Sequence, residues 1–150
     1  MPNVLSPSFA LESSICNYLT VAAGTSGSAL SGSAFTAYTG IGNTDKMTVP
    51  AVTVDASDIR EVVPFSRCYE FNTKIDVAEM AADTVTLGTL ANAIFNEFVD
   101  SKTASGNISN ANYNIAVWQV QTMGMTPGFR EDALTHTIEL RIVGALVPHT

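Results

Sequence analysis

The stretch RCYEFNTKIDVA at residues 67–78 decides the fold class. Apolar and polar side chains alternate along it, and a period of two is typical of a half-buried β-strand. One face carries Tyr69, Phe71, Thr73, Ile75 and Val77. The other face carries Cys68, Glu70, Asn72, Lys74 and Asp76. We therefore expect a sheet with one face in the core and the other in contact with solvent or a partner.

Two segments have the spacing of amphipathic helices. Residues 7–23 follow a plausible N-cap, Ser6, and begin with Pro7, whose missing N–H costs nothing at the first helical position. Their apolar stripe consists of Leu11, Ile15, Leu19 and Ala22. Residues 84–100 carry a second stripe: Leu87, Leu90, Ala91, Ile94, Phe95 and Phe98. Both stripes predict helices that pack one face against a core.

The other strands follow from shorter patterns. Residues 34–39 and 49–56 are strand candidates, and Pro50 belongs at a strand start or a sheet edge. Residues 113–125 and 133–147 predict a long hairpin, because the Pro-Gly pair within residues 126–132 is a strong turn signal. Residues 101–112 are polar and predict a loop.

The two strands of this hairpin differ in their patterns. In the last strand Ile138, Leu140 and Ile142 are expected to face inward. The strand at residues 113–125 is apolar on both faces, which predicts either a central strand or a strand covered by a partner subunit. We expect one α+β domain over residues 1–150, with a mainly antiparallel sheet of four to five strands and two helices on one face.

The chain is poor in charge. Only 14% of its 150 residues are charged, against about 25% in typical soluble domains. Surfaces covered by neighbouring subunits show this depletion, although a soluble monomer with a neutral polar surface also fits it. The formal net charge is −7 and the seven basic residues are scattered, which argues against a phosphate-binding footprint.

No catalytic motif can be assembled from the sequence. The two histidines, His136 and His149, lack a partner motif, and we interpret His136 as structural. The acidic pairs Asp55/Asp58 and Glu131/Asp132 are interpreted as solvated turns, and no metal-ligand spacing occurs. We predict no enzyme activity, cofactor or metal.

The cysteines and the hydropathy pattern bear on the compartment of the protein. Cys16 and Cys68 favour two free thiols, with a disulfide as the alternative. We expect no signal peptide, because residues 1–8 lack a basic region followed by an apolar run. We expect no membrane span, because no stretch of 18 apolar residues occurs.

Two apolar segments are candidate partner interfaces. Met123, Met125, Phe129 and Arg130 surround the Pro-Gly pair and either contact a partner or fold back onto the core. Val62, Val63 and Phe65 lie in residues 59–67, a docking loop or a core-packed connection between strands.

The layout resembles the tail-terminator (tail-completion) and neck proteins of long-tailed bacteriophages. The resemblance covers nearly the whole chain, through the opening helix FALESSICNYLTVA, the strands VPAVTVDA and CYEFNTKIDV, the helix LGTLANAIFNEF and the final hairpin from NYNIAVWQVQTMGM to HTIELRIVGAL. It implies a hexameric ring in the virion, assembled in the host cytoplasm. The ring would cap the tail tube, dock to the head–tail connector and let DNA pass through its lumen without specific binding.

Two other functions stay open at this point. One is a tail-tube or head–tail connector subunit, which belongs to the same structural class. The other is a small ligand-binding domain or enzyme, which requires a concave polar site.

Overall fold

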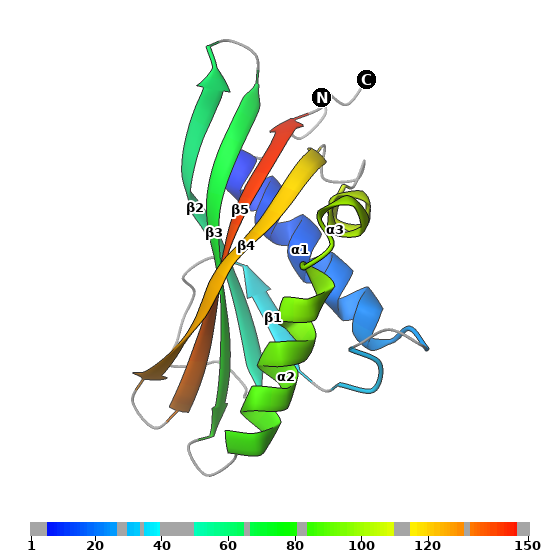
Figure 1. Cartoon of the computed structure of the whole chain (residues 1–150), viewed down its shortest axis with the longest axis vertical. Coiled ribbons are helices and arrows are strands. Elements are labelled where there is room, and N and C mark those ends of the chain that lie inside the picture. Colours follow the sequence, from blue (N-terminus) through cyan, green and yellow to red (C-terminus); the bar gives the residue numbers. More distant parts are fainter. Residues whose placement is uncertain are drawn as a thin grey trace.

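The computed structural model describes residues 6–26, 30–33, 35–39, 50–64, 67–80, 84–109, 115–130 and 133–146. In these residues three helices lie on one face of a five-stranded sheet (Figure 1). The elements in chain order are α1 (Pro7–Ala23), β1 (Thr36–Thr39), β2 (Ala51–Val63), β3 (Cys68–Met80), α2 (Thr84–Glu97), α3 (Ser101–Ile108), β4 (Ile115–Arg130) and β5 (Ala133–Leu146). The expected α+β class with a mostly antiparallel sheet is confirmed.

The strand order in the sheet is β1-β2-β3-β5-β4. Only β1 and β2 pair in parallel; the other neighbours are antiparallel. The β2–β3 hairpin extends past the helices at one end of the molecule, and the β4–β5 hairpin points toward the other end, where α2 begins (Figure 1). Strand β4 lies at one edge of the sheet, with β5 as its neighbour.

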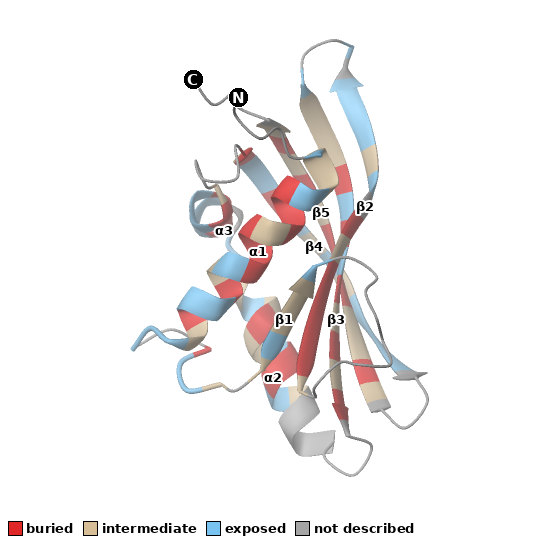
Figure 2. Ribbon diagram, turned by 180° about the vertical axis from the view of Figure 1, so that it is seen from behind, coloured by how far each residue is buried: buried red, intermediate tan, exposed pale blue. Residues whose placement is uncertain are grey.

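The core lies between the sheet and the helices, where Figure 2 shows the buried residues concentrated. The inward faces expected for β3 and β5 are confirmed, since Phe71, Ile75, Ile138 and Ile142 are fully buried. The helices contribute Leu11, Ile15, Leu19, Ile94 and Phe98 to the same cluster.

Helix α1 has the bounds expected from the sequence. The Ser6 hydroxyl accepts a hydrogen bond from the Phe9 N–H at 3.3 Å, and Pro7 occupies the first turn. Helix α2 begins at Thr84, as expected, and ends at Glu97. A one-sided apolar stripe is thus sufficient to place both helices, and in α1 the Ser6 cap also marks the start.

The prediction of a loop at residues 101–112 was wrong, because residues 101–108 form the third helix, α3. The Asp100 carboxylate caps it by accepting from the N–H groups of Lys102 and Thr103. Ala104 and Ile108 are four residues apart and fully buried. Two anchors and a cap therefore outweigh the weak helix propensity of Ser, Gly and Asn.

Strand β2 is longer than expected. It continues to Val63 across a bulge between Asp55 and Asp58, so part of the supposed connection at residues 59–67 is strand. The Glu12 carboxylate on α1 accepts a hydrogen bond from the Ala56 N–H at 3.2 Å in this bulge. A side chain from the helix layer thus supports the irregular part of the strand.

The long hairpin predicted from residues 113–125 and 133–147 is confirmed as β4 and β5, but the Pro-Gly pair within residues 126–132 is not its turn. Strand β4 runs to Arg130, with Pro127 opposite His136 and Gly128 opposite Thr135 on β5. Proline is tolerated there because β4 is an edge strand with one neighbour. The central position considered for this strand is excluded for the same reason.

Candidate interaction surface

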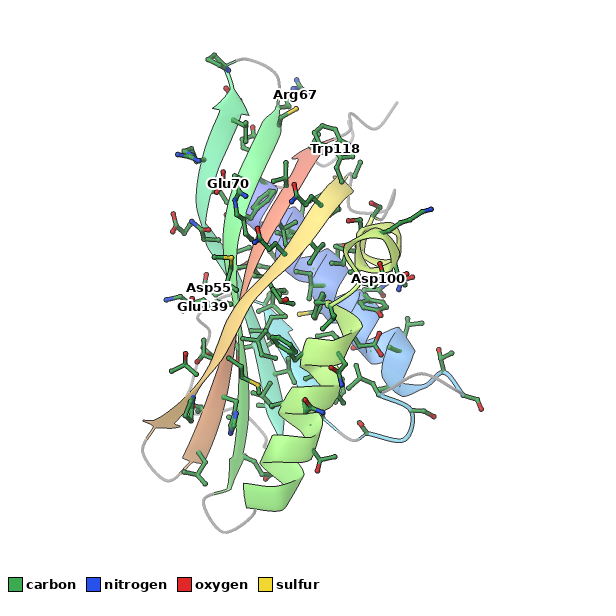
Figure 3. All side chains as sticks on the ribbon, in the orientation of Figure 1. Asp55, Arg67, Glu70, Asp100, Trp118 and Glu139 are labelled. Carbon is green, nitrogen blue, oxygen red and sulfur yellow. The ribbon has the colours of Figure 1, made fainter. Side chains whose placement is uncertain are left out.

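The edge strand β4 carries two large exposed apolar side chains, beyond the point where the Ser109 hydroxyl accepts from the Val117 N–H at 2.8 Å and donates to the Val117 carbonyl at 3.3 Å. The pairing of β4 with β5 shifts register between Val117 and Gln119 and again between Thr122 and Gly124. Each shift leaves one extra residue on β4, namely Trp118 and Met123, and each of these is 57% exposed. A bulge re-aims the side chain of the extra residue, so this exposure follows from the backbone of β4. Figure 3 labels Trp118 near one end of this strand.

The first bulge also changes which residues of β4 face the core. Ile115 and Val117 are buried, and so is Val120, although strict alternation places Val120 on the opposite face. Strict alternation along residues 113–125 would put Trp118 and Val120 on one face, and the bulge separates them. We define the β4 patch as Trp118, Met123 and Met125, the last of which is 38% exposed.

The β4 edge has no ionisable side chain from Ile115 to Phe129. Many proteins carry charged residues, especially lysine, on exposed edge strands, and these prevent pairing with strands of other molecules. Here the two bulges and Pro127 interrupt the edge instead, which limits indiscriminate pairing with other strands. An uncharged edge with exposed Trp and Met has the composition of a protein–protein contact.

The sheet face opposite the helices is held by an ion triad across three strands. Arg141 on β5 binds Glu70 on β3 through two hydrogen bonds of 2.8 and 3.2 Å, and Arg60 on β2 binds the same carboxylate at 2.8 Å. Arg141, and secondly Arg60, lower the pKa of Glu70 to about 2. In the triad a single carboxylate binds two of the seven basic residues of the chain.

The residues predicted as one set of partner contacts do not form one surface. Val62 is 48% exposed near the end of β2, where Val63 pairs with Cys68. Met125 and Arg130 pair with Ile138 and Ala133, toward the opposite end of the sheet. Val63, Phe129 and Arg130 contribute strand backbone, and Phe65 lies outside the described residues. The structure thus separates the β2 group from the β4 group and adds Trp118, which sequence reasoning missed.

The groups considered for chemistry are spread over the fold. His136 is half-buried on β5, and its Nδ1 has no hydrogen-bond partner in the described part of the chain. Asp55 and Asp58 flank the β2 bulge rather than a turn, and Glu131 and Asp132 lie outside the described residues. Across the described ranges, no three His, Cys, Asp or Glu side chains gather into a possible metal site, and no helix has the length and apolarity to cross a bilayer.

Both cysteines are free thiols. Cys16 is buried on α1, and its Sγ donates to the Tyr38 carbonyl at 3.4 Å. Burial, with a smaller contribution from the negative charge of Glu12, raises the pKa of Cys16 to about 12. The thiolate is therefore scarce at neutral pH, which makes Cys16 a packing residue rather than a nucleophile.

No protein-family model matches the chain, and no curated protein matches its sequence.

Proposed function

We propose that the chain is a ring-forming structural subunit of a long-tailed bacteriophage, a tail terminator that caps the tail tube and docks to the head–tail connector. The observation that carries this proposal is the uncharged edge strand β4, whose two bulges expose Trp118 and Met123. The resemblance to phage tail-terminator and neck proteins favours this type of assembly, and the β4 patch provides a surface through which subunits can associate.

A closed ring requires two different patches on each subunit, each meeting the other patch of the neighbour. The β4 patch is one of them, because tryptophan and methionine are enriched at interface centres where charge is depleted. The low charge of the whole chain, 14%, suits a subunit with much of its exterior covered.

The charge balance fits a lumen through which DNA passes. The net charge of −7 repels phosphate, and the Arg60 and Arg141 guanidinium groups are already bound to Glu70. A protein that bound DNA tightly would instead present clustered free Lys and Arg.

The oligomeric state tests the assembly directly. Size-exclusion chromatography with light scattering is expected to show a ring for the wild-type chain. The double variant Trp118→Asp/Met123→Asp is expected to run as a monomer, because removing an anchor from an interface centre costs about 2 kcal/mol or more. Val99→Asp is the matched control, since Val99 is also 57% exposed but lies between α2 and α3. A monomeric wild-type chain, or a double variant that still forms rings, contradicts the proposal.

Electron microscopy of particles that lack the protein tests the place in the virion. Loss of a terminator is expected to give over-long tails. Missing tubes would instead identify a tail-tube subunit, and complete tails detached from heads would identify a connector.

A further inference from the structure

A cleft of about 570 Å³ opens where the three helices meet. Its lining includes Val21 and Ala22 from the last turn of α1, Glu97 at the end of α2, and Asn107 near the end of α3. The C-terminal ends of all three helices therefore converge on one hollow.

This convergence makes the cleft electronegative. The C-terminal end of a helix carries about half a negative charge, which basic residues in the last turn commonly balance. None of α1, α2 and α3 has a basic residue in its last turn. The Glu97 carboxylate adds a full negative charge, and no described Lys or Arg forms an ion pair with it.

The acidic group is held in a fixed position. The Tyr18 hydroxyl donates to Glu97 Oε2, and Asn107 Nδ2 donates to the same hydroxyl at 3.3 Å. The Tyr18 ring packs edge-on against the buried Phe98, with 6.3 Å between ring centroids. Since Tyr18 orients one oxygen of Glu97, the carboxylate is preorganised to bind a cation with its remaining lone pairs.

The remaining lining selects the type of cation. Among the described residues that line this cleft, Glu97 is the one carboxylate, and Asn17, Thr25 and Asn107 add neutral polar groups. One carboxylate suits a single organic cation better than a divalent metal, which prefers several anionic oxygen ligands. Val21 and Ala22 offer an apolar wall, against which an aliphatic stem packs while its charged head reaches Glu97.

We propose that this cleft binds an organic cation, a guanidinium or ammonium group on an aliphatic stem. Such a group is carried by an arginine or lysine side chain of a partner protein or by a free alkylamine.

Saturation-transfer difference NMR on the full chain tests this site, and it also works for large assemblies. Agmatine is the probe for a free alkyl-guanidinium, N-acetyl-arginine methylamide the probe for a protein side chain, and N-acetyl-norleucine methylamide the uncharged control. Saturable transfer is expected for the cationic probes and none for the norleucine compound. Binding of agmatine alone supports the site with a small-molecule ligand; binding of both supports a side-chain ligand. Absence of saturable transfer from agmatine, or equal binding of the norleucine compound, overturns the proposal.

Variants locate the binding. Glu97→Gln is expected to weaken agmatine binding about tenfold or more, since a charge-assisted hydrogen bond is lost. Glu139→Gln removes the same charge from an exposed position on β5 and is expected to leave binding unchanged. Val21→Trp, at a position that is 57% exposed, is expected to fill the cleft without disturbing the core, and it serves if Glu97→Gln does not fold. Unchanged affinity in folded Glu97→Gln, or in Val21→Trp, places the ligand elsewhere and overturns the proposal.

Discussion

Glu12 is a carboxyl group within the helix–sheet interface, and only 6% of the residue is exposed. Burial raises its pKa, and the charge of Asp55 acts in the same direction, while the hydrogen bond from the Ala56 N–H opposes both. The group serves the strand rather than a reaction, because the Ala56 N–H lies in the β2 bulge. Its protonation state therefore affects folding stability.

The pH dependence of stability tests this role of Glu12. A carboxyl whose pKa is higher in the folded state binds more protons there than in the unfolded chain, so its contribution falls as pH rises from about 4.5 through the folded pKa. Urea unfolding between about pH 4 and pH 7 is expected to show this loss in the wild type but not in Glu12→Gln. Glu12→Ala is expected to cost about 1–3 kcal/mol, because it leaves the Ala56 N–H without a partner. A pH profile unchanged in Glu12→Gln would contradict the assignment.

The contribution of Glu70 to stability changes with pH in the opposite direction to that of Glu12. Its pKa is lowered to about 2 by Arg141 and then Arg60, so its contribution is complete above its ordinary pKa of 4.5 and is lost as pH falls toward about 2. Thermal unfolding of Glu70→Gln is expected to give a lower midpoint than the wild type at pH 7, and the two midpoints should converge near pH 2. A constant difference between the midpoints at all pH values would show that packing, not charge, explains the loss.

At the scale of elements, the contact between β4 and β5 depends on a close backbone approach at Gly144. A Cβ on this residue would lie 2.6 Å from the Ala116 carbonyl oxygen of β4. A Cβ added to Gly88, inside α2, would have no neighbouring atom within 4 Å. The close packing of β4 against β5 therefore requires a glycine at position 144, whereas the glycine at position 88 only lowers the stability of α2.

Alanine substitution separates these roles. Gly144→Ala is expected to destabilise the fold by about 1–3 kcal/mol through overpacking. Gly88→Ala is expected to stabilise it by about 0.5–1 kcal/mol, because alanine restricts the unfolded chain and favours the helix. Chemical denaturation of both variants measures the difference, and a neutral Gly144→Ala would show that β4 can move aside.

The elements that sequence patterns predict well are those buried on one side. Helix α1 and strands β3 and β5 keep one period along their length, so their inner faces could be assigned from spacing alone. Strand β4 changes its period at each bulge, and no local residue signals those shifts in advance. The same bulges expose Trp118 and Met123, which explains why Trp118 was missed while Met123 was found only as a neighbour of the supposed turn.

Helix α3 and the cleft were missed for a different reason. The composition of α3 predicts a loop, and its helix depends on contacts with distant elements, such as the hydrogen bond from the Ser14 hydroxyl on α1 to the Ile108 carbonyl. Tyr18 is likewise far in sequence from Glu97 and Asn107, and it meets them only through tertiary packing. Interactions of this type cannot be inferred from local periodicity.

At the scale of the whole molecule, the chemistry of the β4 patch predicts how assembly responds to salt. A contact without charged groups is not screened, so light scattering should give the same oligomer mass from about 0.05 M to about 1 M NaCl, where the Debye length falls to about 3 Å. Dissociation at high salt would instead indicate an interface built on the charged sheet face around Glu70 and Glu139.

The strand order also sets how quickly the protein reaches its native state. The β2–β3 and β4–β5 pairs are each formed by strands that are adjacent in sequence, so these hairpins can form locally. The pairing of β3 with β5, which places Cys68 opposite Ala145, requires closure of the long chain loop that contains α2, α3 and β4. Closing so long a loop is entropically costly before it is rewarded, so the joining of the two hairpins is expected to limit the refolding rate. Before the two hairpins pair, the uncharged β4 edge is part of an incomplete sheet. We therefore expect newly made subunits to associate prematurely most readily at this stage of folding.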